Sequence, residues 1–311
     1  MSEPTSEPTS SAGAGPTFTV VHRTEYQYGT AMSDGYTVAH LLPRETPHQT
    51  VRSAEVHVTP DADEYDEHID MFGNRVVRLG IHHPHEQLGV TARSVVVTNP
   101  PTGVPPGANP DITWEAVAVH TAGLRGPVAL EVAMYLAVTA STPALPVLRQ
   151  LTDRAFAPGR TFLEAVRALC HLIYAEFVFD PGFSDVSTPI DAVVAAKRGV
   201  CQDFAHLAIA CLRSVGLAAR YVSGYIETTP PPGKEKVVGG DASHAWCSVW
   251  APGHGWCDLD PTNDHMPPDR HVTVAWGRDY FDVAPVRGVV IGPASTQHLS
   301  VDVDVARATP T

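Results

Sequence analysis

The strongest constraint on the fold lies in the segment that follows Gly199. Cys201 stands two residues after this glycine. Beyond it, apolar side chains recur at Phe204, Leu207, Ala208, Cys211, Leu212 and Val215. This spacing predicts a helix with one apolar face, which Gly216 ends. Cys201 would then lie in the first turn, where unpaired N–H groups and the helix dipole favour a thiolate. An isolated cysteine is more often a small buried hydrophobe, so its chemistry must rest on other residues.

Composition narrows the class of protein. The chain has 311 residues, a formal net charge of -13 and 43% hydrophobic residues. The acidic balance argues against a nucleic-acid partner, which needs a basic surface. No apolar run is long enough to span a membrane, so we expect no membrane partner. The segment 1–16 lacks the basic and apolar regions of a secretory signal. With five cysteines and no CxxC pair, the chain is predicted to be cytoplasmic with reduced thiols.

Changes in residue composition along the sequence predict four regions. Residues 1–16 are a low-complexity tail, and residues 17–100 hold short β-branched runs between turn residues, typical of an antiparallel β domain. Residues 101–150 are predicted to be a proline-rich linker and a poorly defined connecting segment. Residues 151–311 place helices before a meandering antiparallel sheet, the α+β pattern, and are assigned further C-terminal strands. The second domain opens with a capping box at Thr161 and Glu164.

One histidine-rich stretch invites a metal interpretation. His82, His83, His85 and Glu86 lie close together, but Pro84 prevents a helical arrangement of them. No second ligand cluster with familiar spacing accompanies them. We therefore interpret the stretch as a solvated turn and expect no metal.

A hairpin near the end of the sheet carries residues that complement Cys201. His244 begins one predicted strand, Asp260 ends the next, and a short turn joins the two strands. Cross-strand neighbours on one face are within reach of a hydrogen bond. An imidazole raises the thiolate fraction of a cysteine, and an acceptor on its other nitrogen fixes its tautomer. Asp258 points to the same face as Asp260, so periodicity alone leaves the choice between them open.

Four blocks of the chain resemble the bacterial transglutaminase-like superfamily. They occur in the family's order: Gly199-Val200-Cys201-Gln202-Asp203-Phe204-Ala205-His206-Leu207, then residues 218–225, then Asp241-Ala242-Ser243-His244-Ala245-Trp246, then Gly255-Trp256 with Leu259-Asp260-Pro261-Thr262-Asn263. Phe72-Gly73-Asn74 and its flanking strands resemble the β domain that precedes the core in this subgroup. The resemblance implies a papain-like core, in which a helix carrying the nucleophile packs on an antiparallel sheet.

The resemblance also implies roles for individual residues. Cys201 matches the nucleophile, His244 the base and Asp260 the orienting acid, a choice against Asp258. The backbone N–H of Cys201 is our candidate oxyanion donor. Neither a cofactor nor the calcium sites of the mammalian members are carried over, because no acidic loop of that kind is present.

Residues around the motif are assigned secondary roles. Gln202, Asp203 and Trp246 are candidate substrate-binding residues, although Asp203 fits a helix-capping role equally well. His206 lies five residues beyond Cys201, on another face of the helix, and is expected to be structural. Cys247 and Cys257 are expected to be core residues. The loop 227–241 precedes His244 and is a candidate flap over the cleft.

The resulting prediction is a cytoplasmic cysteine protease or amidase that forms an acyl-enzyme on Cys201. Its partner would be a protein or peptide substrate, and the oligomeric state is left open. Acyl transfer from glutamine to an amine is the close alternative, since the sequence does not separate an amine acceptor from water. Acyl transfer from a thioester donor and a non-catalytic binding module on the same fold are further alternatives.

Overall fold

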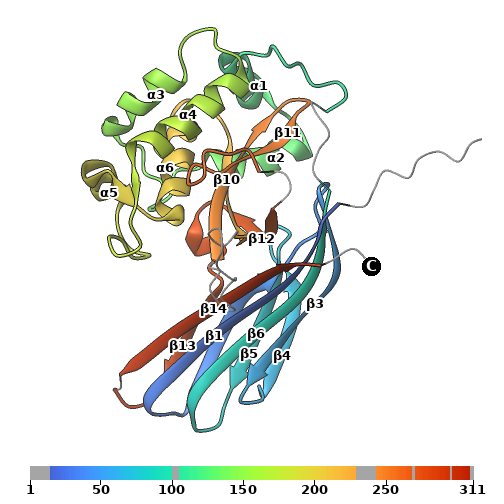
Figure 1. Ribbon diagram of the computed structural model, residues 1–311, viewed down its shortest axis with the longest axis vertical. Helices are drawn as coiled ribbons and strands as arrows, with labels where there is room; N and C mark the ends of the chain where they lie inside the picture. The colour runs from blue at the N-terminus through green and yellow to red at the C-terminus, as the bar shows by residue number, and fades with distance from the viewer. Residues whose placement is uncertain (1–14, 100–104, 229–242, 268–269, 295, 309–311) are drawn as a thin grey trace, which may run out of the picture.

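The computed structural model describes residues 15–99, 105–228, 243–267, 270–294 and 296–308. They form a β-sandwich, at the bottom of Figure 1, and an α+β unit above it. This order confirms the predicted antiparallel β domain followed by an α+β core.

The sandwich consists of two four-stranded antiparallel sheets, ordered β14-β1-β6-β3 and β13-β2-β5-β4. Its N-terminal strands are β1 (Thr17–Met32), β2 (Asp34–Leu42), β3 (Gln49–Thr59), β4 (Glu64–Ile69), β5 (Arg75–Ile81) and β6 (His85–Thr98). Inward-facing residues of both sheets, such as Leu41, Leu79 and Val90, form a core between them. The sequence pattern did not predict β4, because this edge strand buries no side chain and so lacks apolar alternation.

The C-terminal strands correct the predicted domain boundary. β13 (Val286–Ile291) pairs with β2, and β14 (Gln297–Arg307) pairs with β1. Both complete the sheets of the N-terminal sandwich, so the assignment of residues 151–311 to one catalytic domain was wrong at its C-terminal end. The paired strands are more than 200 residues apart in the chain. No local sequence signal identifies the partner strand, since either sheet offers an edge with unpaired backbone groups.

The segment predicted as a linker is mostly helical where the structure describes it. It contains α1 (Trp114–Gly123), α2 (Pro127–Ala133), the 3₁₀ turns η1 (Met134–Leu136) and η2 (Pro146–Leu148), and the start of α3 (Arg149–Ala155). Val117 and Leu148 are buried in the core of the α+β unit. α1 was missed because only Val117 and Thr121 are buried on it, which leaves no apolar stripe in the sequence.

The α+β unit packs helices on an antiparallel sheet ordered β11-β10-β9-β12 (Figure 1). Its helices are α4 (Phe162–Glu176), α5 (Ile190–Ala196), α6 (Cys201–Ser214) and the 3₁₀ turn η3 (Tyr280–Asp282). Its strands are β9 (Ala219–Ile226), β10 (Ser243–Ala251), β11 (Gly255–Leu259) and β12 (His271–Gly277), beside a short parallel pair of β7 (Val178–Phe179) and β8 (Arg198–Gly199). The Glu164 carboxylate accepts hydrogen bonds from the Thr161 hydroxyl and N–H at the start of α4, where the capping box was predicted.

Helix α6 is the central element of this unit. Its residues from Asp203 to Arg213 are all buried, and it contacts both β9 and β10. It ends where predicted: Gly216 has a φ of 80°, and the N–H groups of Gly216 and Leu217 bond the carbonyls of Arg213 and Leu212. Glycine adopts this left-handed conformation without steric cost.

The sandwich and the α+β unit meet along the free edge of β12. The carboxamide of Gln49 bonds the backbone of Thr273 through both its nitrogen and its oxygen, at 2.7 and 2.8 Å. The carboxamide of Asn74 does the same at Trp276, at 2.9 and 3.0 Å. These amides satisfy backbone groups that an edge strand otherwise leaves unpaired.

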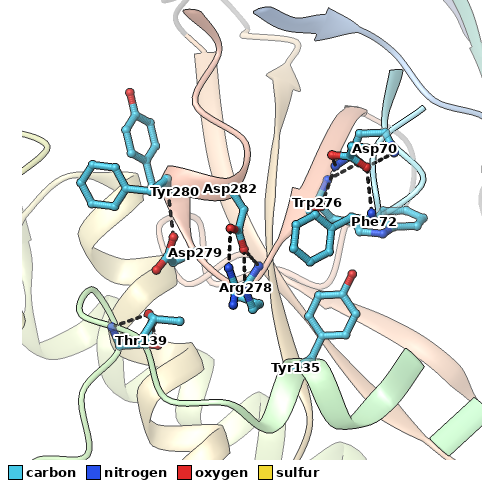
Figure 2. A network of polar contacts seen from close by, with 12 residues as sticks. Asp70, Phe72, Tyr135, Thr139, Trp276, Arg278, Asp279, Tyr280 and Asp282 are labelled. Atoms are coloured by element: carbon cyan, nitrogen blue, oxygen red, sulfur yellow. Dashed lines mark hydrogen bonds and ion pairs between the residues drawn. The ribbon is translucent and has the colours of Figure 1, made fainter. Parts of the chain in front are cut away.

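Figure 2 shows the neighbourhood of this edge. The Asp70 carboxylate accepts the N–H groups of Phe72 and Asn74 and so holds the β4–β5 turn against Trp276. Arg278 bonds both carboxylate oxygens of Asp282 at 2.8 and 2.9 Å, which fixes η3 at the end of β12. β12 is therefore held along its free edge by the two carboxamides and at its end by η3, which fixes the positions of its residues.

Candidate active site

Cys201 is the first residue of α6, as predicted, and its side chain is half-buried. The Asp203 carboxylate accepts the N–H of Val200 at 2.8 Å and closes the helix start. A Cβ on Gly199 would lie 2.8 Å from that carboxylate, so the close approach requires glycine. The turn thereby delivers the thiol to the positive end of the helix dipole.

His244 and Asp260 lie together on the hairpin of β10 and β11. Nε2 of His244 is 2.7 Å from Oδ2 of Asp260. Cys247 pairs with Leu259, so the two residues meet diagonally, from the start of β10 to the end of β11, rather than directly opposite each other. Asp258 pairs with Ser248, farther along the hairpin. Of the two candidate carboxylates, Asp260 is the one that contacts His244.

Asp260 is fully buried and accepts five hydrogen bonds. Its Oδ1 accepts the N–H groups of Thr262 and Asn263, and its Oδ2 accepts from His244, His271 and the Asn263 carboxamide. Burial alone would raise the pKa of Asp260, but the hydrogen bonds from His244 and His271 hold it well below its ordinary value. The site therefore contains a fixed, buried negative charge.

This charge determines the state of His244. Burial lowers the pKa of His244, but its hydrogen bonds to Asp260 and Cys201 outweigh burial and raise the pKa to about 10. His244 is thus a cation at neutral pH, with Nε2 occupied by Asp260. A cationic imidazole beside a cysteine favours the thiolate, the form that attacks carbonyl carbon.

His271, at the start of β12, is a member of this cluster that the sequence analysis missed. Its Nε2 lies 3.0 Å from the same oxygen of Asp260 that His244 contacts. Burial lowers the pKa of His271, against the effect of Asp260. No local pattern marks this histidine, because its position follows from the pairing of β12 with β9.

His244, Asp260 and His271 are also residue types that bind metals, and their donor atoms lie within 4.8 Å of one another. Tetrahedral zinc would hold its nitrogen and oxygen ligands about 3.3 Å apart. The two observed N···O distances of 2.7 and 3.0 Å are those of direct hydrogen bonds. We therefore interpret the cluster as a hydrogen-bonded network.

The three predicted substrate-binding residues differ in exposure. Gln202 is half-buried beside Cys201. Asp203 is buried and bonds Val200 and the Ser184 hydroxyl, which is the capping role weighed as its alternative. Trp246 is 0% exposed and lies against the rings of His244 and His271, so the predicted substrate contact is corrected to a supporting one. Alternation along β10 could have shown that Trp246 shares the His244 face.

Gly224 packs closely against the indole of Trp246, so a larger residue at this position should be destabilising. An added Cβ would lie 2.1 Å from the Val272 carbonyl oxygen and 2.6 Å from the indole of Trp246. We expect Gly224→Ala to lower the free energy of unfolding by about 3 kcal/mol. Gly123→Ala, which meets nothing within 4 Å, is the control and should change it by less than about 0.5 kcal/mol. Equal urea-unfolding curves for the two variants would contradict this packing.

His206 is structural, as expected. It is buried, and its Nε2 accepts the N–H of Tyr280 at 3.1 Å. Burial lowers its pKa to about 4. The unfolded chain therefore binds a proton that the folded chain does not between pH 6.5 and 4, so stability falls as the pH drops through this range.

The variant His206→Gln tests this pH dependence, because glutamine keeps an acceptor for the Tyr280 N–H but does not titrate. Between pH 6.5 and 4, the wild type should lose about 3 kcal/mol more unfolding free energy than this variant. Urea unfolding at a series of pH values measures the difference. Parallel pH dependences would show that His206 titrates normally in the folded protein.

Among the remaining thiols, Cys170 lies beside the cluster, with its Sγ 3.3 Å from the backbone carbonyl oxygen of Asp260. All five cysteines are unpaired. Cys247 is fully buried, and Cys257 pairs with Val249 rather than with Cys247, so the two do not face each other. His82 and His83 lie beside Asp34 and Asp63 in a solvated turn, whereas His85 is buried at the start of β6, so the prediction was wrong for His85. Most of the predicted flap, residues 229–241 of 227–241, lies outside the described residues.

None of the helices that the structure describes has the length and apolar character needed to cross a membrane.

Comparison with known proteins places the chain in a family. The model of the bacterial transglutaminase-like N-terminal region matches residues 18–97, and that of the transglutaminase-like superfamily matches residues 149–261. An uncharacterized protein of Mycobacterium tuberculosis is 39% identical over 93% of this chain and 92% of its own length. One of Mycobacterium leprae is 34% identical over 93% of this chain and 98% of its own.

The chain therefore belongs to the transglutaminase-like superfamily, in the bacterial form with the N-terminal β region. A solved structure from Cytophaga hutchinsonii, named as a proposed cysteine protease, has a TM-score of 0.74 and 21% identity. The match covers 96% of this chain and 93% of that one, and at this identity it shows a shared fold alone.

Proposed function

We propose that the protein is a cysteine-dependent hydrolase of amide or peptide bonds, with Cys201, His244 and Asp260 as its catalytic residues. The observation that carries this proposal is the position of His244, which interacts with Cys201 on one side and bonds buried Asp260 at 2.7 Å on the other. This arrangement supplies a nucleophile, a proton carrier and a group that orients the carrier.

The reaction would proceed in two halves. The Cys201 thiolate attacks the carbonyl carbon, and the backbone N–H of Cys201 is one donor to the oxyanion. The His244 imidazolium gives its proton to the leaving nitrogen, the C–N bond breaks, and an acyl-enzyme remains on Cys201. Neutral His244 then takes a proton from water as the water attacks the thioester, which releases the acid and restores the thiolate.

Asp260 contributes by holding His244. Its hydrogen bond fixes the ring with Nε2 toward the carboxylate, so that Nδ1 is the nitrogen left for Cys201 and the leaving group. The buried carboxylate also stabilises the imidazolium that alternates with the neutral ring during the cycle. It does not need to accept the proton.

Transfer of the acyl group from glutamine to an amine remains the second candidate. It uses the same acyl-enzyme and differs only in the acceptor, which depends on how the site admits an amine and excludes water. A cytoplasmic location also stays a proposal. It is supported by five unpaired cysteines, the state that a reducing compartment maintains.

Mass spectrometry can test the proposal and separate the acceptors. The protein is incubated with unfolded casein, with and without dansylcadaverine, and compared with Cys201→Ala. Hydrolysis would produce new peptide termini or deamidated glutamine, whereas transfer would add the amine mass to glutamine. Thioester adducts on Cys201 in acid-quenched samples would support either. Identical product and adduct patterns for the wild type and Cys201→Ala, across casein and a mixed peptide library, would overturn the proposal.

A further inference from the structure

A second histidine, His271, lies against the candidate catalytic aspartate. His271 lies ten residues beyond the range matched by the superfamily model, which ends at 261. It belongs to β12, whereas His244 belongs to β10 and Asp260 follows β11. Two separate strands therefore place two imidazole rings on one carboxylate oxygen of Asp260, which follows a third strand.

We propose that His271 is a positioning residue, which donates a hydrogen bond from Nε2 to Oδ2 of Asp260 and thereby keeps this carboxylate aimed at His244. The inference rests on the function proposed above, because it assigns His271 a role in that reaction. It does not require His271 to touch the substrate.

The direction of the hydrogen bond follows from the surroundings of His271. The side chain is 3% exposed, and its Nδ1 has no partner among the described residues. A proton on Nδ1 would be buried without an acceptor, so the neutral ring carries its hydrogen on Nε2. Facing an ionised carboxylate, Nε2 can only donate.

The groups around His271 also keep it neutral. They are the rings of His244 and Trp246 from β10, the ring of His265 from the loop after β11, and the carboxylate of Asp260. Asp258 acts from farther away, and the cationic His244 opposes a second positive charge. Burial and His244 lower the pKa of His271, while the two acids raise it, and the net direction is downward. His244 thus carries the cation, and His271 serves as a neutral donor.

Hydrogen bonds to both carboxylate oxygens hold Asp260 in place. Its Oδ1 is fixed by the backbone of Thr262 and Asn263. Its Oδ2 is shared by His244, His271 and the side chain of Asn263. Asn263 is exposed, so among the described donors to Oδ2 only His244 and His271 are themselves buried. Without it, the carboxylate plane is held less firmly toward His244.

The test uses carboxamides of two lengths in place of the imidazole. His271→Gln can bring an N–H close to the position of Nε2, whereas His271→Asn is one methylene too short. His271→Leu supplies a side chain of similar size with no donor. Each variant is assayed for kcat and KM on the substrate found for the wild type. The rate of Cys201 alkylation by iodoacetamide is measured against pH, and thermal unfolding is recorded.

We expect His271→Gln to stay within about threefold of the wild-type kcat. His271→Asn and His271→Leu should lose about 10- to 100-fold in kcat with little change in KM, as small misplacements of catalytic groups do. A His244 cation that Asp260 stabilises less well has a lower pKa, so it supports the Cys201 thiolate less. The pH at which Cys201 becomes reactive should therefore rise by about one unit in Asn and Leu, and not in Gln.

Two outcomes would overturn the inference. Equal losses in all three variants with an unchanged alkylation profile would show that His271 only fills space, and wild-type behaviour in all three would show that it is dispensable. If Leu does not fold, Gln and Asn still decide between these results. The alkylation profile is measured without substrate. It therefore tests the positioning role of His271 even if the Cys201→Ala comparison shows that the proposed reaction is wrong.

Discussion

Replacing Cys201 by alanine should lower amide turnover by about 10⁴-fold or more and leave the fold intact. Without the thiol no acyl-enzyme can form, and the hydrogen bonds of Asp260 do not involve Cys201. The side chain is half-buried at the start of α6, so its truncation should cost about 1 kcal/mol or less of unfolding free energy. Initial rates and urea unfolding measure the two effects.

Cys257→Ala is the matched control for this variant. It removes another partly buried thiol of the same unit, on β11 rather than α6. Its turnover should remain within about twofold of the wild type, because Cys257 pairs with Val249, away from the cluster. Comparable loss in both alanine variants would assign the effect to folding and count against Cys201 as the nucleophile.

Asp260→Ala should be the most damaging substitution for stability as well as for activity. It removes the acceptor for five donors in a fully buried position and leaves His244 without its anion. Loss of one partner of such a buried ionic network costs about 3–5 kcal/mol. Turnover should fall by about 10⁴-fold, as expected when the orienting carboxylate of a nucleophile–histidine pair is lost.

Asp258→Ala is the control for this substitution. Asp258 shares the face of Asp260 but pairs with Ser248 and makes no hydrogen bond to His244. We expect near-normal turnover and a smaller loss of unfolding free energy than for Asp260→Ala, because Asp258 faces the buried Arg220 guanidinium only through its charge. If Asp258→Ala were the inactive variant and Asp260→Ala the active one, the assignment of the acid would be reversed.

The local features of the α+β unit could be predicted from sequence because short-range physics determines them. Helix α6 follows from the apolar spacing after Cys201 and from the stop at Gly216, and α4 follows from Thr161 and Glu164. The hairpin of β10 and β11 has a short turn, so the proximity of His244 and Asp260 was also accessible. The choice of Asp260 over Asp258 came from the family resemblance alone, since alternation treats both alike until the strand register is known.

The missed features depend on contacts between distant segments. β13 pairs with β2 and β14 pairs with β1, and the sequences of β13 and β14 do not indicate which strands they pair with. His271 reaches Asp260 only because β12 lies on β9, across the sheet from β11. The polar anchors Gln49 and Asn74 hold the edge of β12 from the other domain, which no local periodicity can reveal.

The most direct test of the central claim is the pH dependence of Cys201 alkylation in the wild type and in His244→Ala, followed by peptide mass spectrometry. If His244 and Asp260 activate Cys201, iodoacetamide should label Cys201 at pH 6 ahead of the other four cysteines, and His244→Ala should lose this advantage by about tenfold or more. If Cys201 instead reacts like an ordinary thiol, only as the pH approaches about 8.5, in both proteins, the claim that this cluster is a catalytic site is contradicted.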